Sequence, residues 1–403
     1  MINNENVQQW KFDSNKLTAI FLVSITGMLG LMPLSVLPMF VGLIIDDLKF
    51  STEVAGALIA VNLFGNAIGV LLVSFVQKLT RKQIVYCGVI LTIIFELASL
   101  NTASITGLFI LRFVAGIGGG LVTGAAYSWL AKHKSPDKGF AVLIFLQFLL
   151  SAILLYSLTS YAEKYGLATL YWLFIVSALV SLLCCPILAQ NPNPNITTDN
   201  TQKNRVNKPA NTLNKVVITK VLLSLALFEL AASGLWAFIE RMGVAWQLTF
   251  SDIGTGLSLG SLAGIPGSLL VIILGLKYGR SIPLTLGIMI SIVSLVLFTL
   301  GTPNLLNYVI GLVIFNLSWS YTVPYIQGIQ AQIDETGSIA IWGMFTVLTA
   351  IAAGPFIFGI IIKYNGYQSA IYVAIVLLII SFISIFSIAK KLDSSTLSEQ
   401  SAN

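Results

Sequence analysis

The stretch FILRFVAGIGGG, residues 109–120, places one arginine and four glycines in an otherwise apolar run. Two structures could account for it: a glycine-rich loop that cradles a phosphate, or a membrane-spanning helix that carries a single charge. A phosphate loop follows a β-strand and ends in Gly-Lys-Ser/Thr, whereas Gly120 is followed by Leu-Val-Thr. The glycines therefore favour a helix, and the composition of the chain tests that prediction.

The composition indicates a protein whose surface faces lipid. The chain has 403 residues, of which 56% are hydrophobic and 9% charged, and its mean hydropathy is +0.90. Soluble domains carry about 25% charged residues. Long apolar runs without strict alternation favour helices over barrel strands, and about 20 residues cross the hydrocarbon layer. Twelve such stretches are predicted: 17–45, 53–76, 83–101, 105–131, 140–161, 167–189, 217–240, 253–276, 282–301, 304–328, 338–362 and 368–389.

The distribution of basic residues predicts the orientation. If the N-terminus is cytoplasmic and the spans alternate, most of the 22 lysines and arginines fall on the cytoplasmic side, as the positive-inside rule requires. The expected organisation is a cytoplasmic tail (1–16), a six-helix bundle (17–189), a cytoplasmic linker (190–214), a second bundle (215–390) and a cytoplasmic tail (391–403). We expect a multi-pass protein of the bacterial inner membrane. Its net charge of +6 needs no nucleic-acid partner.

Short segments of the first half of the chain recur, with changes, in the second half. FSTEVAG at 50–56 recurs as FSDIGTG at 250–256, RKQIVYCG at 81–88 aligns with RSIPLTLG at 280–287, and KYG at 164–166 resembles KYNG at 363–366. Six spans per half make the repeats parallel, so the bundles are related by a pseudo-two-fold axis along the membrane normal. This all-α architecture is typical of transporters that rock two bundles around a site near the membrane midplane.

Three motifs carry a resemblance to a known family. Residues 108–118 read Leu-x-x-x-Arg-x-x-x-Gly-x-Gly, residues 73–82 read VSFVQKLTRK, and residues 276–280 read LKYGR. With these motifs the chain resembles the major facilitator superfamily over essentially its full length. The loop motif departs from the family pattern, with Val73, Gln77 and Thr80 in place of Gly, Asp and Gly, and LKYGR lacks the acid. A Gly-Pro pair typical of drug/proton antiporters is absent from the fifth span, and Gly354-Pro355 lies in the eleventh instead.

Charges inside the spans are the candidate site residues. The resemblance implies a coupling role for Arg112, which would tune a nearby proton or an anionic substrate; the alternative is an arginine that snorkels or ties two helices together. Glu229 and Glu240 share a stripe of the seventh span with Ser233 and Trp236, and one of them is the predicted proton site, although an interfacial pair with Arg241 is the alternative for Glu240. The partner of Arg112 is left open between Glu229, Glu240 and a substrate anion.

Other residues are assigned structural or lining roles. Glu96 is expected to make a structural hydrogen bond on a peripheral helix, and Asp46 and Glu53 to be solvated charges at span ends. Glycines at every fourth position from Gly116 to Gly124 predict close helix packing. The predicted cavity-lining residues, each with an interhelical contact as its alternative, are Asn62, Asn66, Tyr127, Gln147, Trp236, Asn316, Trp319, Tyr321 and Trp342.

These features predict a secondary active transporter of a small organic solute, coupled to protons and embedded in the bilayer as a monomer. The alternatives are an uncoupled facilitator and a non-transporting membrane sensor or enzyme. No catalytic motif, cofactor or metal site is expected, because Cys87, Cys184 and Cys185 lie in apolar spans and His133 is the only histidine. An anionic or amphipathic solute is favoured by the arginine, while import, export, symport and antiport stay open.

Overall fold

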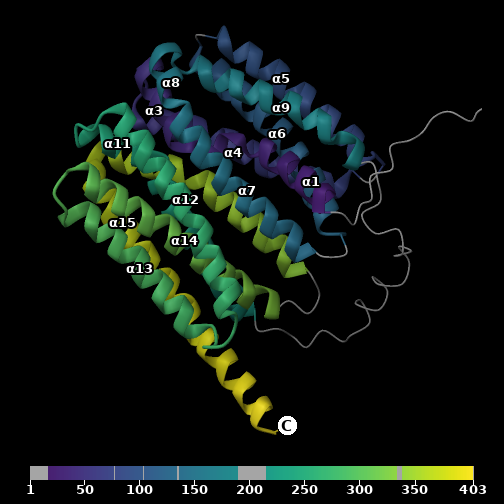
Figure 1. Ribbon diagram of the computed structural model, residues 1–403, viewed down its shortest axis with the longest axis vertical. Helices are drawn as coiled ribbons and strands as arrows, with labels where there is room; N and C mark the ends of the chain where they lie inside the picture. The colour runs from purple at the N-terminus through teal and green to yellow at the C-terminus, as the bar shows by residue number, and fades with distance from the viewer. Residues whose placement is uncertain are drawn as a thin grey trace, which may run out of the picture.

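The computed structural model describes residues 17–76, 78–102, 104–133, 136–188, 215–333 and 338–402, and these form two helical bundles side by side (Figure 1). The N-terminal bundle contains α1 (Leu17–Gly30), α2 (Met32–Ser35), α3 (Leu37–Leu48), α4 (Thr52–Phe75), α5 (Arg81–Leu100), α6 (Ile105–Leu130), α7 (Pro136–Ser157), α8 (Thr159–Tyr165) and α9 (Ala168–Leu188). The C-terminal bundle contains α11 (Lys215–Ala245), α12 (Phe250–Leu274), α13 (Ser281–Leu300), α14 (Leu305–Ile333) and α15 (Ser338–Ala402).

Two groups of six spans account for these helices. Among the described residues, 10 helices are long and apolar enough to cross a membrane. One of them, within α15, covers two predicted spans, which meet at Gly366 where φ is 78°. The first predicted span corresponds to the shorter helices α1 to α3. The twelve-span, all-α prediction is thus confirmed, while the predicted tail 1–16 and linker 190–214 lie outside the described residues.

The first span is broken, which the prediction of one stretch over 17–45 did not anticipate. The helix is interrupted at Leu31 and again at Val36, and Pro33 and Pro38 lie in the first turns of α2 and α3. Proline has no N–H to donate to the carbonyl four residues earlier, so it favours the start of a new helix. The N–H of Leu34 bonds to Leu31 O at 3.0 Å, and the Gly30 carbonyl accepts instead from Asn66 Nδ2 at 3.0 Å.

The repeated sequence segments fall at equivalent helix ends. Ser51 caps α4 and Thr249 caps α12, each side chain accepting a backbone N–H of the first turn. Gly166 and Gly366, with φ of 58° and 78°, both stand between the fifth and sixth spans of their halves. Left-handed φ values favour glycine. The fifth span itself ends earlier than the predicted 161, because α7 stops at Ser157 and α8 follows.

Glycines bring α4 and α6 into backbone contact, as their spacing predicted. A Cβ on Gly116 would meet the Asn62 carbonyl, and a Cβ on Gly120 would meet the Asn66 carbonyl. Small residues at a helix interface let backbones approach this closely in a membrane. The packing fixes the depth of α6, and hence of Arg112, against α4.

Replacing Gly120 by valine is therefore expected to destabilise the N-terminal bundle by about 1–3 kcal/mol, because an overpacked contact must move a backbone. Thermal unfolding of the purified protein in detergent measures the loss. Gly328→Val is the matched control, since the nearest atom to a Cβ there is Arg280 Nε at 3.6 Å, an ordinary contact. Equal unfolding temperatures for the two variants would contradict the close-packing role.

The two bundles meet at one end, called here the distal end, which lies opposite the ends at residues 17, 188 and 215. Arg241 of α11 binds Asp46 of α3 at 2.7 Å, and Lys363 of α15 pairs with Glu53 of α4. Thr52 Oγ1 donates to the Gly359 carbonyl at 3.0 Å. In Figure 1, α3, α8 and the end of α11 gather at this end. The conformation is therefore closed at the distal end.

Candidate functional site

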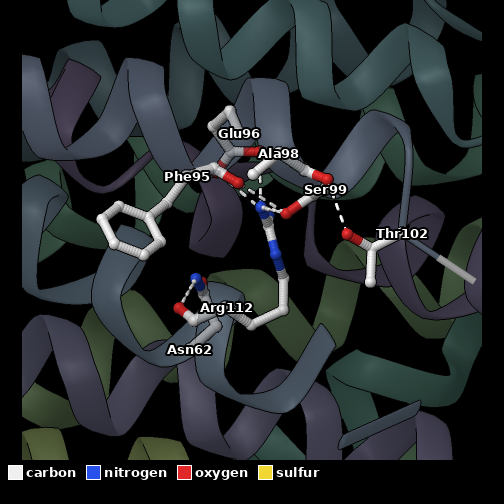
Figure 2. A network of polar contacts seen from close by, with 7 residues as sticks. All are labelled: Asn62, Phe95, Glu96, Ala98, Ser99, Thr102 and Arg112. Carbon is white, nitrogen blue, oxygen red and sulfur yellow. Dashed lines mark hydrogen bonds and ion pairs between the residues drawn. The ribbon is translucent and has the colours of Figure 1, made fainter. Parts of the chain in front are cut away.

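Arg112 binds Glu96 in a buried two-pronged ion pair between α6 and α5 (Figure 2). Its Nη1 lies 3.0 Å from Glu96 Oε1 and its Nη2 lies 2.8 Å from Oε2. Nη2 also donates to Ser99 Oγ at 2.6 Å, and that hydroxyl donates to the Phe95 carbonyl. The arginine is 0% and the glutamate 1% exposed. The pair is neutral as a whole, which offsets the cost of burying either charge.

A third helix completes this cluster. The guanidinium carbon of Arg112 lies 4.6 Å from the centre of the Tyr171 ring of α9, a cation–π contact. Arg112 Nε and Tyr171 OH are both buried without a hydrogen-bond partner. Neither Glu229 nor Glu240 reaches the arginine; its partner is Glu96, which makes the structural hydrogen bonds expected of it, here as one half of an ion pair. The structure thus corrects the expected partner of Arg112 and shows the alternative, an arginine that ties two helices together.

Asn62 and Asn66 of α4 tie helices together through backbone carbonyls. Asn62 Nδ2 donates to the Arg112 carbonyl at 2.8 Å, and Asn66 Nδ2 donates to the Gly30 carbonyl at the break after α1. Both residues line a cavity of about 30 Å³ inside the N-terminal bundle, together with Glu96 and Phe174. Asn66 Oδ1 is buried there without a partner. A water molecule needs about 10–15 Å³ of such volume, so the cavity holds only two or three waters and is too small for an organic solute.

Glu229 occupies a different environment in the C-terminal bundle. Its side chain on α11 is 2% exposed and accepts a hydrogen bond from Trp319 Nε1 of α14 at 3.2 Å. The Trp319 ring stands edge-on to Phe148 of α7, with ring centres 5.9 Å apart. Because α7 belongs to the other bundle, the indole links the carboxylate to the interface. Among the described residues, no lysine or arginine pairs with Glu229.

Glu240 belongs to the closed distal end. Its carboxylate accepts from Arg241 Nε at 2.6 Å and from Nη2 at 2.7 Å, while Nη1 and Nη2 of the same arginine bind Asp46 at 2.7 and 2.8 Å. Glu240 also packs against Gly42 of α3. Asp46 and Glu53, expected as solvated charges, are instead partners across the bundle interface. This arginine therefore joins one carboxylate from each bundle.

The remaining predicted lining residues are spread through both bundles. Tyr127 stands edge-on to Phe140, Tyr321 to Tyr325, and Asn316 Nδ2 donates to the Leu312 carbonyl of its own helix at 3.1 Å. Gln147 is half-buried, and Trp236 packs on the main apolar core. The side chain of Trp342 lies outside the described residues. Of the predicted set, only Glu229 and Trp319 come together in a side-chain hydrogen bond among the residues described.

A carboxylate from the last helix binds the chain at the end of the LKYGR motif. Asp393 of α15 accepts the backbone N–H groups of Arg280 at 2.8 Å and Ser281 at 2.9 Å, at the start of α13. Arg280 also donates to Gln332 of α14. Helix starts carry unpaired N–H groups and a partial positive charge. Asp393 thus caps α13 from a position more than a hundred residues away in sequence.

Removing this cap by Asp393→Ala is expected to destabilise the protein by about 1 kcal/mol, the usual value of a helix N-cap. Protease cleavage of the segment 275–281 in the native protein should become faster, because α13 would fray at its first turn. Ser394→Ala, one residue further and exposed, is the control. Unchanged cleavage in Asp393→Ala would show that the cap does not hold this loop.

Two facing six-helix bundles, with a buried carboxylate and aromatic rings next to their interface, define a secondary active transporter of small solutes. The chain belongs to the major facilitator superfamily, whose family model matches residues 19–335. No curated protein matches the chain.

Solved structures of transporters share this fold at low sequence identity. The D-xylose-proton symporter is 14% identical, with a TM-score of 0.70 over 90% of this chain and 97% of that one. The nucleoside transporter NupG is 14% identical, with a TM-score of 0.65 over 92% and 98%. A bacterial homologue of the human lysosomal transporter Spinster, in an inward-facing and unoccupied conformation, is 16% identical, with a TM-score of 0.65 over 93% and 96%.

Proposed function

We propose that this transporter couples solute movement to protons and that Glu229 carries the coupling proton. The observation that carries the proposal is the environment of its carboxylate, which is buried, accepts one hydrogen bond from a neutral donor and has no basic partner among the described residues. A buried charge without a counter-charge is costly, and taking up a proton removes that cost. The buried carboxylates of Glu96 and Glu240, by contrast, each bind an arginine.

The proposed cycle uses the distal end as one of two gates. The bundles rock about the interface near Phe148 and Trp319, and the Asp46–Arg241 and Glu53–Lys363 pairs break when the distal end opens. We place the protein in the bacterial cytoplasmic membrane as a monomer, with the distal end outside and both termini in the cytoplasm. The support for this orientation is the excess of basic residues in the predicted cytoplasmic segments.

Proton coupling is tested in proteoliposomes that contain a pH-sensitive dye. A nucleoside, a pentose and an organic ammonium compound are added in turn, and lumen pH is followed together with uptake of the labelled solute. In the wild type, the transported solute is expected to change lumen pH. Glu229→Gln should lose the proton flux even at solute concentrations that saturate the variant, because the substitution keeps the shape of the side chain but cannot release a proton.

Glu163→Gln is the matched control, since Glu163 is an exposed carboxylate at the distal end, and it should couple like the wild type. Solute uptake without any pH change in the wild type would favour an uncoupled facilitator. Proton flux that survives in Glu229→Gln would assign the coupling to another residue.

A further inference from the structure

We infer that the transported solute is an organic cation with an apolar or aromatic body, bound by Glu229, Trp319 and Phe148. The inference rests on the proposed function in one respect, namely that the solute reaches the carboxylate that handles the proton. It differs from the expectation of an anionic solute, which depended on Arg112 being free to bind it.

Charge is the first argument. Apart from His133 in the loop after α6, the buried acidic and basic side chains of the described residues form three groups. Arg112 is neutralised by Glu96, and Arg241 is shared by Glu240 and Asp46 at the distal end. Of these buried acids, Glu229 alone lacks a basic partner in the described part of the chain. The interior therefore offers a negative charge near the bundle interface and no free positive one, which attracts a cation and repels an anion.

The shape of the surroundings is the second argument. Trp319 holds the carboxylate with its indole N–H and turns its ring toward Phe148, which in turn packs against Gly264 of α12. Aromatic faces attract cations, and a carboxylate attracts a positive charge whether or not that charge carries an N–H. A cationic solute can thus exchange the weak indole donor for a full positive charge while its body lies against the two rings.

The side-chain amides give the third argument. A neutral polyhydroxylated solute needs several polar groups free to bond it. The amide nitrogens of the three asparagines predicted to line a cavity all donate to backbone carbonyls, Asn62 at 2.8 Å, Asn66 at 3.0 Å and Asn316 at 3.1 Å. Asn62 and Asn66 join neighbouring helices and Asn316 bonds its own helix, which leaves Asn66 Oδ1 as the one unpartnered amide oxygen of these three in the described interior. Such an interior is poorly equipped for a sugar and better equipped for a cation with apolar groups.

Binding of matched ions to the purified full-length protein tests this inference. The cations tetraphenylphosphonium and benzyltrimethylammonium are compared with the anion tetraphenylborate, which has the size and shape of the first cation. Equilibrium dialysis against detergent micelles, with binding to empty micelles subtracted, gives the dissociation constants. At least one cation is expected to bind saturably and about tenfold or more tightly than the anion, and Glu229→Gln should weaken that cation by about tenfold or more.

Further variants separate recognition from folding. Glu229→Asp should bind the cation within a few-fold of wild type, Trp319→Phe should retain more affinity than Trp319→Ala, and the exposed Glu163→Gln should not change it. Gel-filtration profiles check that each variant is folded. The inference is overturned if tetraphenylborate binds as tightly as the cations, if neither cation binds saturably, or if Glu229→Gln binds like wild type. The assay uses no proton gradient, so its failure is distinct from a failure of proton coupling.

Discussion

Replacing Glu96 by glutamine is expected to destabilise the protein by about 3–5 kcal/mol, the cost of leaving a buried ion with no counter-charge. The side chains of Arg112 and Glu96 are 0% and 2% exposed, so water cannot screen the arginine that remains. Ser99 and the Tyr171 ring stay in contact with it, but neither carries a charge. The loss should appear as early unfolding of the N-terminal bundle.

Thermal unfolding followed by tryptophan fluorescence measures this effect, with Glu163→Gln as the exposed-carboxylate control. The double variant Glu96→Gln/Arg112→Gln should recover a large part of the loss, because two neutral amides can bond each other where one unpaired charge cannot. A Glu96→Gln protein within about 1 kcal/mol of wild type would mean that water or another group solvates Arg112 in the folded state.

Replacing Arg241 by glutamine is expected to open the distal end. The arginine joins Glu240 of one bundle to Asp46 of the other, and without it two carboxylates face each other across the interface. Most of the destabilisation of the closed state comes from Glu240, whose side chain is 5% exposed. The side chain of Asp46 is 43% exposed, so water screens its charge in part. A loss of about 3 kcal/mol from the closed state would raise the open population by about a hundredfold.

Spin labels on the exposed positions Glu163→Cys and Gln368→Cys, one in each bundle, report the opening as a longer distance. Cys87 is exposed and is replaced by serine in this background, whereas Cys184 and Cys185 are buried. Lys363→Gln is the comparison, because its pair with Glu53 is 37% and 31% exposed and screened by water, so its loss should leave the distal end closed. Distances in Arg241→Gln that match the wild type would exclude a gating role for this arginine.

The arrangement of spans was predictable because hydropathy, span length and the repeated segments all depend on local sequence. FSTEVAG and FSDIGTG, for example, mark equivalent helix starts, and the glycines from Gly116 to Gly124 predict close packing from spacing alone. The break in the first span was not predicted. The break leaves the Gly30 carbonyl without the N–H of Leu34, and whether Asn66 would bond that carbonyl instead depends on the packing of α4.

The partners of the buried charges were predicted less well than the spans. Helical spacing shows which residues of one helix lie on the same face, but it does not show which other helix packs against that face. For Arg112 a signal did exist: only four residues separate α5 from α6, so the two helices form an antiparallel hairpin that sets Glu96 and Arg112 at similar depth. No such signal joins Glu229 to Trp319, which are 90 positions apart and meet only through the bundle fold.

The two parts of the interrupted first span pack against different bundles. The helix before the break, α1, packs on α6, α7 and α9 of its own bundle. The helix after it, α3, packs on α11 of the other bundle. Pro33 and Pro38 remove hydrogen bonds that would otherwise stiffen the segment. We expect α3 to bend at these two breaks when Asp46 releases Arg241, so that the distal end can open without disturbing the Arg112–Glu96 pair.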